Sequence, residues 1–149
     1  MNPLLTPSPL PYQLPPFADI TPDHIRQALE AGMAEQRAEV DAIAANGDEP
    51  DFANTIEGLE RSGQTLQRTE LLFGTLAGTC STAEIQAIEA EFAPRLAAHS
   101  DAVRLNPALF ARIDAVHAYR SEAGLTAEQV RLVERYHLDF VLAGAGLDD

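Results

Sequence analysis

Two acid-x-x-histidine pairs are the residues of this sequence with the clearest potential for chemistry. Glu134 and His137 lie in the stretch VERYHLDF, and Asp114 and His117 repeat the same spacing earlier in the chain. Residues three apart are neighbours on one face of an α-helix, so each pair would present a carboxylate next to an imidazole. Helix bundles of the ferritin type use such pairs to hold metal ions. The sequence therefore raises the question of a metal centre in a helical protein.

A ferritin-like site also needs carboxylates on the buried faces of two further helices. Glu70 is the one acid close to the apolar line of the helix expected around it. His117 and His137 continue apolar stripes of their own helices, and a histidine in such a place is usually a core residue with one ring nitrogen hydrogen-bonded. We therefore interpret both as packing residues. No catalytic, metal-binding or cofactor-binding residue is predicted in this chain.

The other chemical motifs are weaker still. The zinc-peptidase motif His-Glu-x-x-His is absent, because none of the four histidines is followed by Glu. Cys80 has no nearby histidine and follows a glycine-rich helix end, so a buried or half-buried thiol is expected rather than a nucleophile. The glycines of AGAGLDD do not form a phosphate loop, since no strand precedes them and no lysine follows.

Composition narrows the class of protein. The 149 residues fit one domain, and 23 acids against 10 basic residues give a net charge of −13. Such a charge repels phosphate backbones and anionic lipid, so neither nucleic acid nor a membrane is an expected partner. The lone cysteine excludes an internal disulfide, no run approaches the length of a membrane span, and the N-terminus does not resemble a signal peptide. A cytoplasmic protein is predicted.

Proline placement separates an arm from a helical body. Seven of the ten prolines lie within residues 1–22, where they prevent an α-helix. Residues 1–20 are therefore predicted to form an extended arm packed on the body, which spans residues 21–149. The apolar residues expected to face the body are Leu10, Tyr12, Leu14 and Phe17.

The body shows helical spacing and no convincing strand, so the predicted fold class is all-α, with about five helices in a bundle or in stacked hairpins. The expected helices open at the N-cap Thr21, near Asn54 or Thr55, at a capping box Ser81–Glu84, at Asn106-Pro107, and at a capping box Thr126–Gln129. The first is predicted to end in a left-handed cap at Asn46-Gly47, and the second to continue to about Thr79. The third is predicted to pass Pro94 as one kinked helix.

Several stretches of the chain resemble the N-terminal region of the thimet oligopeptidase family of zinc metallopeptidases, and above all its bacterial peptidyl-dipeptidase and oligopeptidase branch. They are NPLL (2–5), LPPFADITPDHIRQALEAGMAEQ (14–36), FANTIEGLERSG (52–63), AEFAPRLAAHSDAVRLNPALFARI (90–113) and LTAEQVRLVERYHLDFVLAGAGLD (125–148). The match is collinear over nearly the whole chain. Ala53 departs from it, because the family commonly has an acid there.

The resemblance implies that this chain is the N-terminal, non-catalytic domain of a larger helical peptidase. In that family zinc is held by a His-Glu-x-x-His helix and a later Glu, beyond residue 149 here, in a channel that admits short peptides. The N-terminal helices form part of the lobe that walls the channel. The expected partner is the missing C-terminal catalytic domain, zinc is expected only in the parent, and the fragment alone is expected to be inactive. The alternative is a free-standing helical interaction module, with a ferritin-like metal bundle a distant third.

Overall fold

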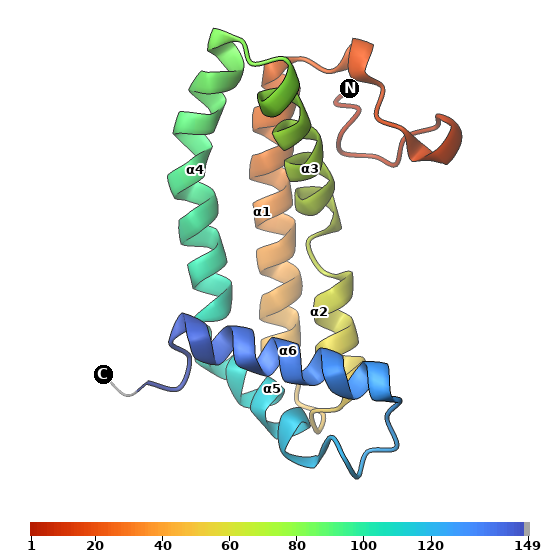
Figure 1. Cartoon of the computed structure of the whole chain (residues 1–149), viewed down its shortest axis with the longest axis vertical. Coiled ribbons are helices and arrows are strands. Elements are labelled where there is room, and N and C mark those ends of the chain that lie inside the picture. Colours follow the sequence, from red (N-terminus) through yellow and green to blue (C-terminus); the bar gives the residue numbers. More distant parts are fainter. Residues whose placement is uncertain (148–149) are drawn as a thin grey trace. The chain divides into compact units, whose positions relative to one another are not determined.

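The computed structural model describes residues 1–147, and every regular element among them is a helix (Figure 1). The α-helices are α1 (Pro22–Ala44), α2 (Gly58–Arg61), α3 (Gln64–Thr79), α4 (Ala83–Arg104), α5 (Pro107–Tyr119) and α6 (Ala127–Ala143). Short turns of other helix types are η1 (Pro11–Gln13), η2 (Phe17–Asp19) and the π-helical η3 (Phe52–Glu57). The all-α prediction is confirmed, since 73% of the described residues are helical and no strand occurs among them. No helix within that range is both long and apolar enough to cross a membrane.

The chain forms two compact units, which are described separately. The first unit combines Met1–Arg37 with Gly63–Ala97, and the second combines Ala38–Ser62 with Ala98–Asp149. The boundaries fall inside α1 and α4, so each of these two helices contributes residues to both units. Each unit has its own cluster of buried apolar side chains.

The core of the first unit is built from one face each of α1, α3 and α4. Its members are Leu4, Ile25, Ala28, Leu29, Leu66, Leu72, Phe73, Ile85, Ile88 and Phe92. The spacing of Ile25, Leu29 and the half-buried Met33 places them on one side of α1. Gly32 lies on the same face and brings α1 close to α3, because a Cβ atom added there would lie 2.8 Å from the backbone of Leu66.

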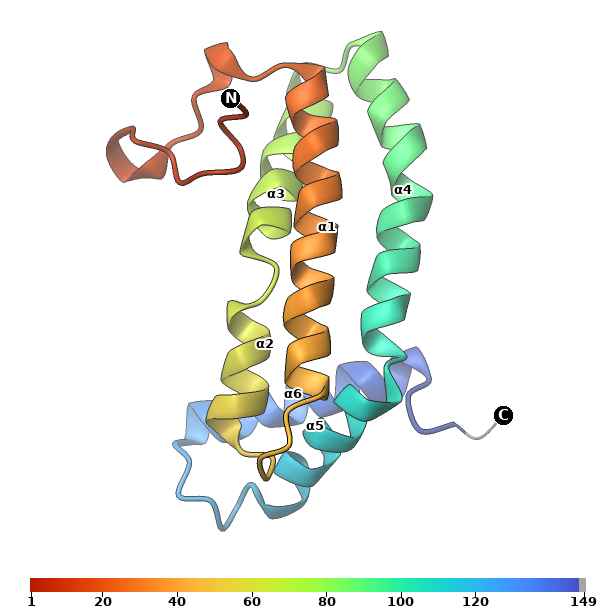
Figure 2. The same ribbon diagram turned by 180° about the vertical axis from the view of Figure 1, so that it is seen from behind.

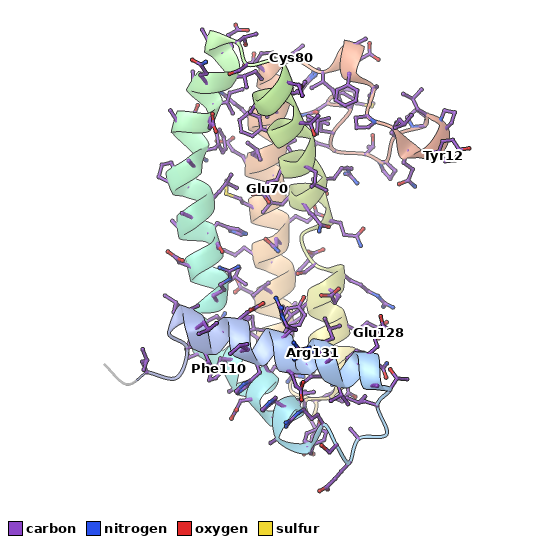
Figure 3. The ribbon with its side chains drawn as sticks, in the orientation of Figure 1. Tyr12, Glu70, Cys80, Phe110, Glu128 and Arg131 are labelled. Carbon is purple, nitrogen blue, oxygen red and sulfur yellow. The ribbon has the colours of Figure 1, made fainter. Side chains whose placement is uncertain are left out.

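The N-terminal arm differs from the prediction in which residues it buries. The four side chains expected to face the body are 43% to 97% exposed, with Tyr12 the most exposed and pointing away from the helices (Figure 3). Leu4 is instead only 2% exposed and joins the core. The neighbouring Asn2 donates a hydrogen bond to the His24 carbonyl (2.8 Å), and Arg68 donates one to the Leu4 carbonyl (3.0 Å). The arm is anchored at its start because these polar contacts accompany the burial of Leu4.

Helix α1 begins as predicted and ends differently. The Thr21 hydroxyl accepts the His24 N–H (3.2 Å), and the His24 ring nitrogen accepts the Thr21 N–H (3.3 Å), so the N-cap prediction is confirmed. The left-handed cap predicted at Asn46-Gly47 is wrong, because neither residue has a positive φ. The Asn46 side chain instead accepts the Asp48 N–H (2.9 Å), which turns the chain through a side-chain contact.

The predicted second helix is interrupted. The chain forms η3 and the single turn α2, and then breaks at Ser62, which is extended, and Gly63, which has a φ of 68°. The prediction of one helix up to Thr79 is therefore wrong. Only glycine adopts this φ without strain, and the Gln36 side chain occupies the space where a Cβ would lie.

The third predicted helix, α4, is one helix through Pro94, so the prediction of an uninterrupted helix there is confirmed. Its kink remains a prediction. The N-cap lies one residue later than expected, since the Thr82 hydroxyl accepts the Ile85 N–H (3.3 Å). Ser81 instead accepts a hydrogen bond from the Gln86 side chain (3.2 Å).

The second unit is centred on α5 and α6, which lie against each other in both views of the chain (Figures 1 and 2). Its buried residues are Val40, Ile56, Leu59, Leu109, Ile113, Val116, Val133 and Phe140. The predicted caps are confirmed: the Asn106 side chain accepts the Leu109 N–H, and Thr126 and Gln129 form a reciprocal capping box. Helix α6 ends at Gly144, whose φ of 104° identifies the glycine-rich AGAG stretch as a helix C-cap.

Candidate functional site

Helices α5 and α6 bring three of the four residues of the acid-x-x-histidine pairs together. Asp114 and His117 lie one turn apart on α5, and His137 reaches them from α6. The His137 Nε2 atom lies 3.0 Å from the Asp114 Oδ1 atom. The imidazole rings of His117 and His137 are stacked, with their centroids 3.9 Å apart and their planes 8° from parallel. These three residues are called the Asp–His–His cluster below.

Aromatic packing from the core fixes one side of the cluster. The Phe110 ring lies 5.7 Å from the His137 ring and is stacked on Phe140 at 6.4 Å, centroid to centroid. Phe140 is itself only 4% exposed. Phe110 therefore packs beside His137 and connects it to the buried Phe140.

Glu134, the remaining acid of the two pairs, forms ion pairs with arginines instead. Its carboxylate lies 3.4 Å from Arg120 Nε and 3.5 Å from Arg131 Nη1. Arg120 also donates a hydrogen bond to the His117 carbonyl (2.6 Å) at the end of α5. The spacing in sequence thus pairs Glu134 with His137, whereas in space Asp114 is the partner of His137.

The two histidines lie at the rim of the second core. Both are half-buried, and the side chain of His137 is 22% exposed, so they pack at the edge of the core and not at its centre. Each lies one turn of its helix away from a fully buried residue, Ile113 on α5 and Val133 on α6, at positions rotated toward the surface. The expected hydrogen bond to a ring nitrogen is present in His137, with Asp114 as its partner.

The environment of His117 favours the neutral imidazole. Burial lowers its pKa most strongly, and electrostatic interactions with the neighbouring His137 and Arg120 lower the pKa further. The carboxylates of Asp114 and Glu134 offset part of this shift. A neutral imidazole keeps a lone pair on one ring nitrogen, which can accept a hydrogen bond or bind a metal ion.

The donor atoms of the Asp–His–His cluster all lie within 4.8 Å of one another. One carboxylate oxygen and two imidazole nitrogens are a donor set that proteins use for zinc and related ions. The cluster contains no hydroxyl or thiol nucleophile.

Cys80 is exposed at the end of α3 (Figure 3), so the expectation of a buried or half-buried thiol is wrong. The cysteine follows the last turn of the helix, beyond the face that packs on the core.

A second polar cluster in the same unit is structural. Arg112 is 6% exposed and donates to the carbonyls of Asn46 (2.6 Å) and Asp48 (3.0 Å) and to the Asn54 side chain (2.8 Å). The Tyr119 hydroxyl donates to the Pro50 carbonyl in the same loop. Sequence reasoning missed Arg112, and no local signal distinguishes it from a surface arginine of α5. These bonds fix the loop that joins α1 to η3.

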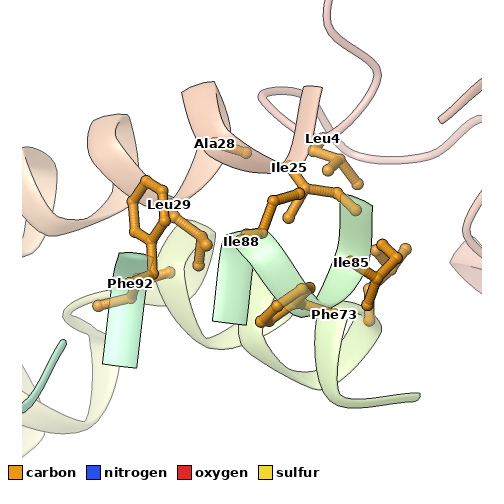
Figure 4. Close-up of a cluster of buried hydrophobic side chains, with 10 residues drawn as sticks. Leu4, Ile25, Ala28, Leu29, Phe73, Ile85, Ile88 and Phe92 are labelled. Carbon is orange, nitrogen blue, oxygen red and sulfur yellow. The ribbon is translucent and has the colours of Figure 1, made fainter. Parts of the chain in front are cut away.

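The first unit carries an open groove of about 490 Å³ between the arm and α3. Leu14 and Phe17 of the arm line it together with Arg68 and Leu71 of α3. Leu14, Phe17 and Leu71 are each at least half exposed. Figure 4 shows the core of the first unit, to which Leu4 of the arm and Ile25 of α1 both belong. The groove contains one ionisable group, Arg68, and no arrangement for catalysis.

Comparison with known proteins finds relatives that align with nearly the whole chain. The dipeptidyl carboxypeptidase of Escherichia coli (strain K12) is 45% identical over 147 residues, which cover 99% of this chain and 22% of that protein. The dipeptidyl carboxypeptidase of Salmonella typhimurium is 44% identical over 146 residues, with 98% and 22% covered. Oligopeptidase A of S. typhimurium is 28% identical over 152 residues, with 98% and 21% covered. No family model matches the chain. The chain therefore spans about a fifth of the length of these curated relatives, and the match lies in their N-terminal region.

Proposed function

Since this chain belongs, as an N-terminal region, to the thimet oligopeptidase family, we propose that it is the non-catalytic helical part of a peptidase that hydrolyses short peptides. The observation that carries this proposal is the 45% identity with a dipeptidyl carboxypeptidase over 99% of the chain. Identity at this level over the full length of a helical domain is far more specific than any single motif described above.

In the whole protein we propose that zinc performs the chemistry and that this part of the chain helps to wall the substrate channel. The hydrolysis of a peptide by such an enzyme needs a metal ion that lowers the pKa of bound water and a carboxylate that takes up the proton. A His-Glu-x-x-His helix supplies both, and the 149 residues contain none. The partners proposed for this chain are accordingly its C-terminal catalytic domain and, in the parent, short peptides.

The cellular location proposed is the cytoplasm. A lone cysteine that is exposed on the surface is compatible with a reducing compartment. The net charge of −13 disfavours attachment to anionic lipid surfaces.

The test combines the sequence of the gene downstream of codon 149 with an assay of peptide cleavage. The reading frame should continue from codon 149 for several hundred codons and encode a His-Glu-x-x-His motif. The purified 149-residue chain, incubated with zinc and a quenched fluorescent peptide, should show no turnover, whereas the whole protein should cleave the peptide and lose this activity with a chelator.

Two results would contradict the proposal in different ways. A stop codon directly after residue 149 would favour the alternative, a free-standing helical interaction module. Turnover that follows the 149-residue chain through purification and disappears with a chelator would show that this part of the protein is itself catalytic.

A further inference from the structure

We propose that the Asp–His–His cluster binds one divalent transition-metal ion, of the zinc class, through Asp114, His117 and His137. The site belongs to the second unit and uses only residues of α5 and α6. It is independent of the catalytic zinc proposed for the parent protein, whose ligands lie outside this chain.

The distance between Asp114 and His137 is already close to that between two ligands of one metal ion. Zinc binds imidazole nitrogen and carboxylate oxygen at about 2.0–2.2 Å, so two ligand atoms on a tetrahedral ion lie roughly 3.3 Å apart. Asp114 Oδ1 and His137 Nε2 are 3.0 Å apart, which leaves an ion room to replace the hydrogen between them after a small movement. The ligand atom of His117 lies within 4.8 Å of those of the other two residues. Because the imidazole rings of His117 and His137 are stacked in nearly parallel planes, metal binding requires the His117 ring to rotate out of the stack, so that its nitrogen faces the same ion.

The chemistry of the cluster selects the class of ion. Two imidazole nitrogens and one carboxylate oxygen suit zinc, cobalt and nickel better than magnesium or calcium, which prefer oxygen ligands alone. Three protein ligands leave a fourth tetrahedral position for water. Magnesium therefore serves as a negative control in the test below.

The surroundings hold the ligands in place and also limit the affinity. Phe110 packs against the ring of His137, and that ring stacks on the ring of His117, so neither ligand has to be ordered from a disordered state. The positive charge of Arg120 weakens the binding of a metal cation at the cluster. Glu134 neutralises part of that charge, because it lies 3.4 Å from Arg120.

A purely structural role for the cluster makes a different prediction. If the stacked histidines served only to pack α5 against α6, any added metal would bind without preference for these side chains. Dependence of binding on each of the three ligands therefore distinguishes the two roles.

The test uses the untagged 149-residue chain, stripped of metal, and cobalt as a spectroscopic probe. One equivalent of cobalt should produce the visible absorption bands of a low-coordinate site, and zinc should displace it while magnesium should not. Asp114→Asn, His117→Ala and His137→Ala should each weaken binding roughly tenfold or more, since the loss of even a supporting hydrogen bond costs about that much at metal sites.

A matched control tests whether metal binding depends on the cluster or only on the number of histidines in the chain. His99→Gln removes a histidine that is not part of the cluster and should leave the cobalt affinity unchanged. Circular dichroism of each variant establishes that it is folded, and Asp114→Asn is informative even if a histidine variant unfolds, because Asp114 is exposed and the change conserves its volume.

The proposal is overturned by either of two results. One is a folded wild-type chain that binds no cobalt or zinc, and the other is binding that all three ligand variants retain. Because the readout is metal binding and not hydrolysis, neither result bears on the proposed peptidase function.

Discussion

The close approach of α1 to α3 at Gly32 gives a prediction with an unusual sign. Replacing glycine by alanine inside a helix normally stabilises the helix by about 1 kcal/mol, because alanine loses less backbone entropy on folding. At Gly32 the new Cβ would lie 2.8 Å from both the Cα and the N atom of Leu66. Carbon atoms in contact normally lie about 3.5–4.0 Å apart, so the two helices would have to separate by about 1 Å.

The cost of that separation decides the outcome. Overpacking a tight interface typically costs about 1–3 kcal/mol, and the upper part of that range applies here because backbone atoms cannot rotate out of the way. Gly32→Ala is therefore expected to destabilise the protein by about 1–2 kcal/mol after the gain in helix propensity is subtracted. Gly74→Ala is the matched control, since Gly74 lies inside α3, is exposed, and a Cβ there would meet no atom within 4 Å. That variant should be stabilised by about 0.5–1 kcal/mol.

Urea denaturation followed by circular dichroism measures the difference. The two variants should differ by about 1.5–3 kcal/mol, which corresponds to roughly 1 M in the urea midpoint for a protein of this size. The wild-type midpoint should lie between them. If Gly32→Ala raised the midpoint as much as Gly74→Ala, the close contact between α1 and Leu66 would not exist in solution and the reasoning would be refuted.

Two further predictions concern the second unit. Arg112→Met should destabilise the protein by about 2–4 kcal/mol in the same assay, because the carbonyls of Asn46 and Asp48 lose their buried donor. The control is Arg131→Met, which changes an exposed side chain and should alter the stability by less than about 0.5 kcal/mol. The pKa of His117 is lower in the folded protein than in the unfolded chain, so in the presence of a chelator the free energy of unfolding should depend on pH. The contribution of His117 to stability is fully present above the unfolded-state pKa of about 6.5 and is lost as the pH falls through the lower folded-state pKa. His117→Gln should remove this part of the acid-side decline, and a decline identical to that of the wild type would contradict the assignment.

The parts of the fold that could be predicted from the sequence are those set by local signals. Asn106 and the Thr126–Gln129 capping box act within one turn of helix, and both caps are present as expected. The break at Gly63 was missed because it depends on a distant residue: the Gln36 side chain of α1 occupies the space beside the glycine. In the arm, Leu4 and Leu14 are chemically identical, and only the three-dimensional contacts of Asn2 and Arg68 explain why Leu4 is the one that is buried.

In the candidate site, too, the features set within one helix could be predicted and those set by packing between helices could not. Helical spacing correctly predicted that Asp114 lies beside His117 and that Glu134 lies on the helix of His137. Which carboxylate meets His137 depends on how α5 and α6 are rotated about their axes, and this rotation is set by the burial of Ile113, Val116 and Val133 together. No spacing within either helix contains that information. Arg112 was missed for the same reason, since its three acceptors lie at least 58 positions away in the chain.

The anchoring of Asn2 and Leu4 has a consequence for the behaviour of the chain when its backbone is cut. The segment that follows the anchor, around Leu10 and Tyr12, is exposed and carries the turns in which proteases cut most readily. A nick there would turn the anchor from a contact within one chain into a contact between two, held by the burial of Leu4 and by the hydrogen bonds of Asn2 and Arg68. Such contacts are worth a few kcal/mol, or a dissociation constant of about 1 mM, so the short N-terminal peptide would dissociate and leave the position of Leu4 in the first core unfilled.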